Sequence, residues 1–306
     1  MNKFTNAKML ASITSLIGNT PLIEFPYDID NAKIFVKLET YNLTGSVKDR
    51  MALFMLKEAI KEKKVKPGTT IIEATTGNTG IAFAALSSLY GCKMIAIIPK
   101  GQSRERLEMI RAYGAEVIET PQEEGPLGSI IKRDSLAKEI PDSWVPNQFD
   151  NPDNVREHMI GTAQEILKQL EGKSVDYIIH GIGTGGTLMG VGKALKEKFP
   201  SMKIVALEPE ESAVLSGGEP RHHNIQGIGE GFIPSIVEKD VIDDIVRVST
   251  EEAIKETRKI AHTTGLLVGF SSGANIVGIK KLAKKESQEK TFLTFFADRG
   301  ERYLSV

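Results

Sequence analysis

Four glycine-containing segments carry side chains that could do chemistry. In chain order they read NLTGSVKDR (42–50), ATTGNTG (74–80), GIGTGGT (181–187) and GFSSGAN (269–275). Each leads into a helical pattern, and the first backbone N–H groups of a helix attract anions. A phosphate or a carboxylate therefore suits the second and third segments. Taken singly, ATTGNTG and GFSSGAN are equally compatible with ordinary helix caps.

The segment GIGTGG admits two interpretations. It follows the apolar run VDYIIH and precedes the helical pattern TLMGVGKALKEKF, which is the context of a dinucleotide site. Glu208 follows about 20 residues later, at the spacing of the acidic residue that hydrogen-bonds the ribose in a dinucleotide site. Alternatively, the loop holds the phosphate of another ligand through Gly183, Thr184, Gly185, Gly186 and Thr187. The loop alone predicts a phosphate site and leaves the ligand open.

Lys48 stands in the first turn of the helix that begins after NLTGS. A protonated amine is disfavoured at this end of a helix because the dipole is positive there. The position therefore lowers the pKa of the lysine and favours a free amine or a Schiff base. A solvated surface lysine is the alternative interpretation.

The pattern indicates no metal site and no other nucleophile. The five histidines include no pair at the i, i+4 spacing of a helical zinc site, and adjacent His222 and His223 would point apart. No G-x-S-x-G elbow is present, so serine hydrolysis has no anchor. The single cysteine, Cys92, begins the apolar run CKMIAIIP and is expected to be a buried structural thiol.

Short apolar runs alternate with helical patterns along the chain. Several runs lack polar alternation, as expected for strands buried on both faces of a parallel sheet. This rhythm predicts a doubly wound α/β fold. The expected strands are AKIFVKLE, TTIIEATT, KMIAIIP, AEVIET, VDYIIHGI, KIVALEP, DIVRVS and TFLTFFA. The expected helices lie at 47–64, 79–91, 103–114, 154–170, 187–199 and 250–265.

A chain of 306 residues exceeds what one hydrophobic core usually supports, so two domains are expected. The stretch WVPNQFDNPDN (144–154) interrupts the rhythm with prolines and asparagines. We place a smaller N-terminal α/β domain at 35–146, with Lys48 and the ATTGNTG loop. The larger domain, 1–34 and 147–306, carries the GIGTGGT loop and GFSSGAN.

The composition argues against several partner classes. Basic and acidic residues number 39 and 40, and this balance gives no electrostatic reason to expect nucleic acid. No charge-free apolar run reaches the length of a membrane span, and the N-terminal segment MNKFTNAKMLASITSLIGNTP lacks the pattern of a signal peptide. We therefore expect no nucleic acid, no membrane and a cytoplasmic location.

Taken in order, the segments resemble the cysteine synthase and cystathionine β-synthase family, the fold-type II enzymes that depend on pyridoxal 5′-phosphate (PLP). The likeness runs from IGNTPLI (17–23) to DRGERYLS (298–305). The motifs that carry it are GSVKDR, EATTGNTGIA, NQFDNPDN, GIGTGGTLMGV, IQGIG, GFSSGA and GERYLS. GSVKDR and DRGERYLS are most similar to the B-type O-acetylserine sulfhydrylases, whereas GIGTGGTLMGV and IQGIGEGFIP are closer to the A-type.

The resemblance implies an active site in the cleft between the two domains and a role for each motif residue. Lys48 would carry PLP as an internal aldimine and move the substrate α-proton. Asn78 would hydrogen-bond the 3′-oxygen of the ring, and Ser271 would face the pyridine nitrogen. The cofactor phosphate would be held by Gly183, Thr184, Gly185, Gly186 and Thr187. The substrate would be held by Thr75, Thr76, Gly77, Asn78, Thr79, Gln148, Gly227 and Glu230.

The implied reaction is β-replacement through an α-aminoacrylate, in which O-acetyl-L-serine and sulfide give L-cysteine and acetate. A neutral serine opposite the pyridine nitrogen makes the ring a weaker electron sink, which suits direct loss of a β-substituent. The first alternative is the same chemistry on L-cysteine with release of hydrogen sulfide, as in a desulfhydrase or a lanthionine or cystathionine synthase. An NAD(P)-dependent oxidoreductase built on GIGTGG is the alternative from a different class.

Two residues depart from the family pattern. Thr76 replaces the serine of TSGNTG, and Glu230 in GIGEGF puts a carboxylate where a small or apolar residue is usual. One interpretation of Glu230 is an exposed loop residue. The other is a group that binds a second amino group or activates water or a thiol, which would favour cysteine as substrate. As partners, the resemblance implies a homodimer and leaves room for the C-terminal tail of a serine acetyltransferase.

Overall fold

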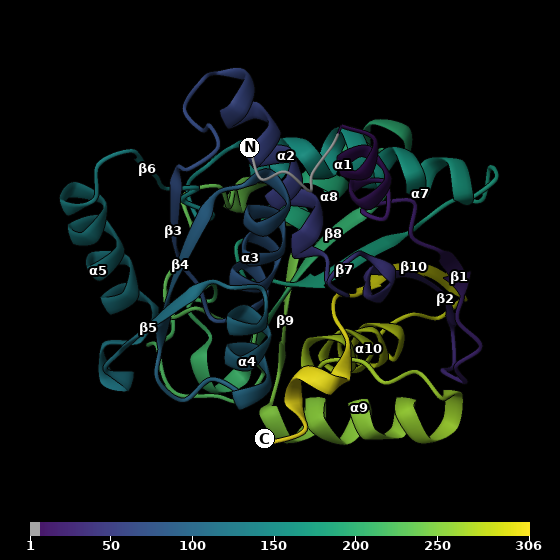
Figure 1. Cartoon of the computed structure of the whole chain (residues 1–306). Coiled ribbons are helices and arrows are strands. Elements are labelled where there is room, and N and C mark those ends of the chain that lie inside the picture. The colour runs from purple at the N-terminus through teal and green to yellow at the C-terminus, as the bar shows by residue number, and fades with distance from the viewer. Residues whose placement is uncertain (1–6) are drawn as a thin grey trace.

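The computed structural model describes residues 7–306, and it contains two sheets that form the centres of two α/β domains (Figure 1). Residues 1–6, where the segment tested for a signal peptide begins, lie outside the described residues. Among residues 7–306, no helix combines the length and the apolar character needed to cross a bilayer.

The larger sheet has six strands in the order β1-β2-β10-β7-β8-β9. Every neighbouring pair is parallel except β1 with β2. The strands are β1 (Leu22–Glu24), β2 (Ala32–Leu38), β7 (Tyr177–Gly181), β8 (Lys203–Pro209), β9 (Asp244–Val248) and β10 (Lys290–Phe296).

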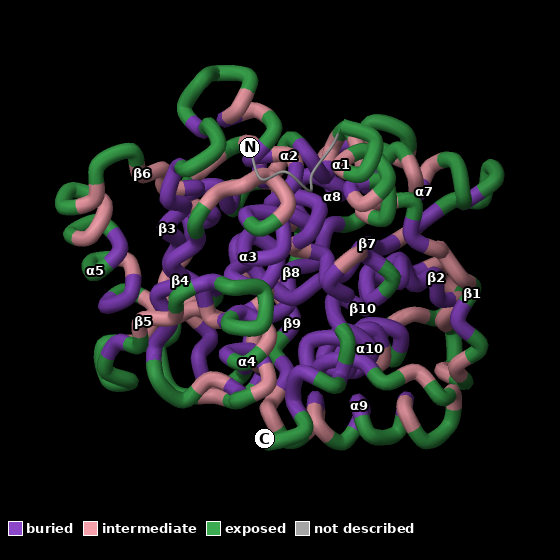
Figure 2. Tube along the Cα trace, in the orientation of Figure 1, coloured by how far each residue is buried: buried purple, intermediate pink, exposed green. Residues whose placement is uncertain are grey.

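Helices cover both faces of this sheet. The helices α9 (Thr250–Thr264) and α10 (Phe270–Ala283) lie against one face, and α7 (Ala163–Gln169) and α8 (Gly186–Lys198) lie against the other (Figure 1). In the inner strands, successive apolar residues enter opposite cores, so strands without polar alternation are buried on both sides. Figure 2 shows the buried residues gathered in the centre of the molecule. The predicted doubly wound fold is confirmed.

The smaller sheet has four parallel strands in the order β5-β4-β3-β6. Three helices share its first core with the sheet, and α5 packs on the opposite face. The strands are β3 (Thr70–Ala74), β4 (Lys93–Pro99), β5 (Glu116–Thr120) and β6 (Ser143–Trp144). The helices are α2 (Lys48–Lys61), α3 (Asn78–Tyr90), α4 (Arg104–Ala112) and α5 (Gly125–Glu139).

The remaining elements are short. Helix α1 (Ala7–Thr14) precedes the first strand, and α6 (Asp153–Glu157) runs through a π-helical turn, η3 (His158–Thr162), into α7. The predicted helix at 154–170 is therefore one helical segment with a π-turn inside it. The 3-10 turns are η1 (Glu39–Tyr41), η2 (Gln122–Glu124), η4 (Glu210–Ser212), η5 (Lys239–Val241) and η6 (Gly300–Tyr303).

Two predictions differ from the structure. The expected domain boundary at residue 35 falls inside β2, which pairs along its whole length with β10 and so belongs to the larger sheet. We propose that the chain enters the smaller domain after β2 instead. Cys92 was expected to be buried and is half-buried, because it lies at the edge of the core beside α3. Burial nevertheless raises the pKa of its thiol, which disfavours a nucleophilic role.

Candidate active site

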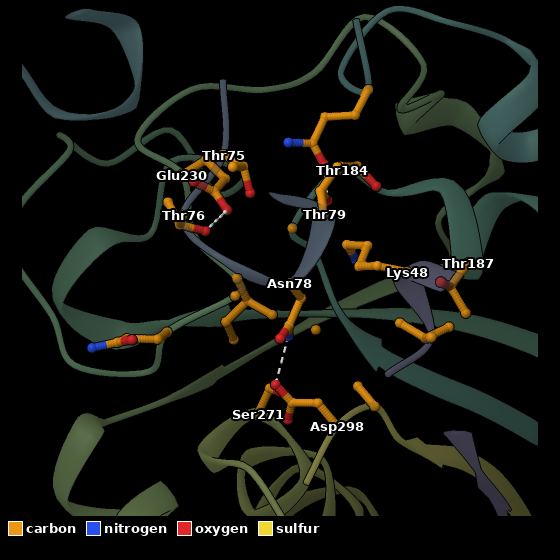
Figure 3. A pocket seen from close by; sticks show the side chains of 18 of the residues that line it. Lys48, Thr75, Thr76, Asn78, Thr79, Thr184, Thr187, Glu230, Ser271 and Asp298 are labelled. Carbon is orange, nitrogen blue, oxygen red and sulfur yellow. Dashed lines mark hydrogen bonds between the residues drawn. The ribbon is translucent and has the colours of Figure 1, made fainter. Parts of the chain in front are cut away.

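A cleft between the two sheets collects the predicted chemistry (Figure 3). It lies where β3 and β7 end and where α2, α3, α8 and α10 begin, so four helix N-termini meet around it. Every residue predicted for the site lines this cleft except Gly77 and Gly186. The order of the motifs along the chain does not reveal that they lie together. Their places after the strands do, because ligands bind at the carboxyl ends of parallel strands.

Gly77 and Gly186 do not line the cleft, but each lets neighbouring segments pack closely. Gly77 caps α3 with φ of 147°, and a Cβ there would lie 2.3 Å from Arg106 Cδ. A Cβ on Gly186 would lie 2.0 Å from Asn154 Oδ1. Both positions therefore exclude side chains for steric reasons.

Lys48 is the first residue of α2, and its half-buried side chain reaches into the cleft (Figure 3). Among the described residues its amine makes no hydrogen bond or ion pair. Burial lowers the pKa of this amine, and the Arg106 guanidinium lowers it further. The Glu230 and Asp298 carboxylates act in the opposite direction. An unpartnered amine with a lowered pKa is suited to act as a nucleophile toward carbonyl groups.

The loop between β7 and α8 forms a cradle of backbone N–H groups and hydroxyls. Gly185 has φ of 90°, and a Cβ there would lie 2.4 Å from Val237 Cγ2. A Cβ on Gly183 would lie 2.4 Å from the backbone oxygen of Gly227. The loop thus approaches the cleft closely at the N-terminus of α8, as an anion site requires.

The segment after β3 is held in place by Gln148. The Thr79 hydroxyl donates to Gln148 Oε1 at 2.5 Å, and Gln148 Nε2 donates to the backbone oxygen of Ala74 at 2.8 Å. The Thr75 hydroxyl accepts from the Gly77 N–H at 2.9 Å. These bonds fix the loop at the N-terminus of α3, where a carboxylate would meet the positive end of the helix.

Asn78 and Ser271 have unused hydrogen-bonding capacity. Asn78 Nδ2 donates to Asp298 Oδ2 at 2.6 Å, while Asn78 Oδ1 is buried without a partner. Ser271 is 4% exposed at the start of α10, and its hydroxyl has no partner within residues 7–306. Buried polar atoms are nearly always paired, so Asn78 Oδ1 marks a place for a ligand, and the Ser271 hydroxyl, which lines the cleft, can bond the same ligand. Together with the free Lys48 amine and the cradle, they fit a small phosphorylated aldehyde with a polar ring.

Sequence reasoning missed several lining residues. Arg106 is 0% exposed and joins Thr76, Gln226 and Asp298 across the cleft. In the helix pattern SRERLEMIRAYG, a buried arginine and a solvent-facing arginine look alike. The local sequence therefore could not identify Arg106 as a residue of the site. His180 on β7 also lines the cleft, and burial lowers its pKa to about 3, so it is neutral.

Glu230 points into the same cleft rather than into solvent. It is half-buried, and its Oε1 accepts a hydrogen bond from the Thr76 hydroxyl at 3.4 Å. Burial raises the pKa of its carboxyl, while Lys48, Thr76 and Arg106 oppose that shift. The two residues that depart from the family pattern are therefore in contact with each other.

Glu208 is not available to a ribose. It is 2% exposed on β8, and its carboxylate accepts from the N–H groups of Leu215 at 2.7 Å and Ser216 at 3.2 Å. These bonds fold the chain back after the strand. The nicotinamide interpretation thus loses the acidic partner on which it depended.

The chain matches known proteins over nearly its whole length. The family described as pyridoxal-phosphate dependent enzymes matches residues 13–298. A cysteine synthase of Staphylococcus aureus (strain N315) is 45% identical over 301 residues, which cover 98% of this chain and 97% of that protein. A probable cysteine synthase of Bacillus subtilis (strain 168) is 44% identical over 303 residues, with the same shares covered.

Solved structures agree with the sequence relatives. The O-acetylserine dependent cystathionine beta-synthase of Helicobacter pylori is 42% identical with a TM-score of 0.92, covering 100% of this chain and 98% of that chain. A hydrogen sulfide-producing enzyme of Fusobacterium nucleatum is 41% identical with a TM-score of 0.91, covering 98% and 92%. The chain belongs to the pyridoxal-phosphate dependent enzymes, in the cysteine synthase and cystathionine β-synthase family.

Proposed function

We propose that the enzyme converts O-acetyl-L-serine and sulfide to L-cysteine and acetate. The observation that carries this proposal is the single cleft that holds a free lysine amine, a phosphate cradle and a carboxylate-binding loop. The cysteine synthases of Staphylococcus aureus and Bacillus subtilis, aligned over 98% of the chain, support the choice of reaction.

PLP would be held by Lys48, Asn78, Ser271 and the loop at 183–187. When bound, it supplies the electron sink that makes the α-proton of an amino acid acidic and lets a β-substituent leave. Ser271 is neutral, so it cannot hold the pyridine nitrogen protonated as an aspartate would. A neutral serine at this position therefore favours loss of a β-substituent over other reactions of the bound amino acid.

Lys48 would move the proton. Burial lowers the pKa of its amine and so favours the neutral form, in which Nζ can accept the α-proton as the bond from Cβ to the acetyl oxygen breaks. Acetate leaves with the electron pair of that bond. A sulfide sulfur then bonds to Cβ, and the proton returns from Nζ to Cα.

The loop at 75–79 and Gln148 would hold the substrate carboxylate. Thr75 offers a hydroxyl proton, whereas the proton of the Thr79 hydroxyl already goes to Gln148, and the first N–H groups of α3 point to the same place. Gln148 keeps this loop fixed through Ala74 and Thr79. Motion of the smaller domain over the carboxylate would exclude water during the reaction.

Glu230 supports a second candidate function, which is release of hydrogen sulfide from L-cysteine. Its carboxyl shares the cleft with Lys48 and contacts Thr76, so it could activate water or a thiol at Cβ. One structural neighbour is a hydrogen sulfide-producing enzyme. In Glu230→Ala, sulfide release should fall more than cysteine synthesis. A proportional change in both activities would remove Glu230 as a specificity device.

A substrate panel tests the proposed function. O-acetylserine, O-phosphoserine, serine and cysteine are each offered with sulfide, and the products are identified by mass. We expect O-acetylserine to give the fastest formation of cysteine. Faster turnover of cysteine alone, with sulfide released, would shift the assignment to the second candidate.

We also propose two partners, on the resemblance to the family. The first is a second copy of the chain, and analytical ultracentrifugation should give the mass of a dimer. The second is the C-terminal tail of a serine acetyltransferase, which would enter through the groove that borders the cleft at Thr76, Gln226 and Glu230. A synthetic peptide of such a tail should compete with O-acetylserine, and a peptide without the terminal carboxylate should not.

A further inference from the structure

Asn154 is a buried side chain that touches both halves of the ligand site without lining the cleft. It lies in α6 within the motif NPDN and is 1% exposed. Its Nδ2 donates to the backbone oxygen of Gln148 at 2.9 Å and to Thr184 Oγ1 at 3.0 Å. One amide group thus connects the substrate-loop support with the phosphate cradle.

The orientation of this amide is determined by its partners. The Gln148 backbone oxygen can only accept a hydrogen bond, so the NH2 end of Asn154 must face it. The same NH2 group then also meets Thr184, and Oδ1 lies against Gly186. The amide is therefore a donor toward the cradle.

This arrangement leaves the Thr184 hydroxyl one remaining role. Its oxygen accepts from Asn154 Nδ2 and also from the Gly186 N–H at 3.3 Å. A hydroxyl oxygen accepts two hydrogen bonds and donates one, so both lone pairs are in use. Thr184 lines the cleft, and the proton is its only free group there.

We propose that Asn154 is a positioning residue that makes Thr184 a hydrogen-bond donor to the cofactor phosphate. Thr187 is less constrained, because its hydroxyl meets the ring Nε2 of His158 at 3.3 Å, which is either a donor or an acceptor. An amide does not titrate, so Asn154 donates to Thr184 at every pH. The Thr184 hydroxyl therefore remains a donor toward the cofactor phosphate. The inference rests on the proposed binding of PLP at this loop.

The first test compares the affinities of the apoenzyme for PLP and for pyridoxal, which lacks the phosphate. Hydrogen bonds to charged groups are worth more than neutral ones, so Asn154→Ala should weaken PLP binding roughly 10-fold or more. Pyridoxal binding should stay within about 2-fold of the wild type. Asn154→Asp should weaken PLP binding further, because a carboxylate cannot donate and repels the phosphate.

Asn151→Ala is the matched control for loosening of the turn. Asn151 belongs to the same NPDN motif, and its side chain bonds the backbone of Pro146 and Asp153 but not the cradle. It should lower the melting temperature while it leaves PLP affinity close to that of the wild type. Equal losses of PLP affinity in Asn151→Ala and Asn154→Ala would overturn the proposal.

The second test is a double-mutant cycle with Thr184→Val. If Asn154 acts through the hydroxyl, Asn154→Ala should weaken PLP binding much less in the Thr184→Val background than in the wild type. The phosphorus NMR signal of bound PLP should also shift alike in both single variants. Additive losses, or an unchanged signal, would refute the role. Failure of the wild type to bind PLP would instead contradict the proposed function.

Discussion

Replacing Arg106 by methionine should loosen the contact between the two domains at the active site. The guanidinium donates to the backbone oxygen of Thr76 at 3.1 Å and to Gln226 Oε1 at 2.8 Å. It also donates to the Tyr303 hydroxyl and lies 3.6 Å from Asp298 Oδ2. Arg106→Met keeps most of the apolar volume and removes every one of these interactions.

The cost follows from burial. Arg106 and Asp298 are both almost completely buried, with 1% and 2% of their side chains exposed. Removing one partner of such a pair leaves an uncompensated charge and costs about 3–5 kcal/mol. Asp298→Asn in the same background removes that charge, so the two variants should be non-additive by about 1–3 kcal/mol.

The functional consequence should appear in KM. Thr76 belongs to the loop proposed to hold the substrate carboxylate, and Arg106 anchors its backbone. Without that anchor, we expect KM for O-acetylserine to rise roughly 10-fold, which corresponds to about 1.4 kcal/mol of binding. The value of kcat should change less, because Arg106 acts on the Lys48 amine only through its charge and makes no hydrogen bond with it.

Urea titrations followed by circular dichroism give the free energies of unfolding, and initial rates give KM and kcat. Arg111→Met is the control, because Arg111 lies on the same helix and makes an exposed pair with Glu108 at 3.1 Å, worth about 0–1 kcal/mol. If Arg106→Met stays within about 1 kcal/mol of the wild type, or if its effect adds to that of Asp298→Asn, the reasoning is wrong.

Two further predictions concern the cradle and a buried carboxyl. Gly183→Ala would place a Cβ 2.4 Å from the Gly227 backbone oxygen. We therefore expect the variant to lose about 1–3 kcal/mol of unfolding free energy and to bind PLP more weakly. A variant as stable as the wild type would contradict the close approach of the two loops. Burial raises the pKa of Glu73 from 4.5 to about 7 beside Arg133. The folded state therefore keeps a proton that the unfolded chain releases between these values. The difference in unfolding free energy between the wild type and Glu73→Gln should favour the wild type most below pH 4.5, and this advantage should be lost as the pH rises to about 7. A difference that stays constant across this range would contradict the raised pKa.

Local pattern was sufficient for most strands, whereas the roles of the motif residues came from the resemblance to the family. The eight expected strands all form, because each is an apolar run that packs into a core. The strands β1 and β6 were missed because three and two residues carry no periodic signal. Helix α5 was missed because GPLG at its start reads as a turn and its buried face is narrow.

Sheet membership and buried charges could not be predicted in this way. β2 precedes the smaller domain in the chain but pairs with β10, whose partner residues are distant in sequence, as in Ala32 with Lys290. Arg106 reads as a surface arginine until the C-terminal segment and the loop at Gln226 close over it. Both features depend on tertiary contacts that no local pattern encodes.

Borohydride reduction of the PLP-loaded enzyme, followed by peptide mass spectrometry, tests the central claim most directly. Borohydride converts the bond between the cofactor aldehyde and a lysine amine into a stable secondary amine, so the label remains on the protein. We predict the label on Lys48 alone, together with loss of the yellow absorbance band and of the label in Lys48→Ala. A label on another lysine, or an unchanged band in Lys48→Ala, would contradict the assignment of this cleft as the PLP site.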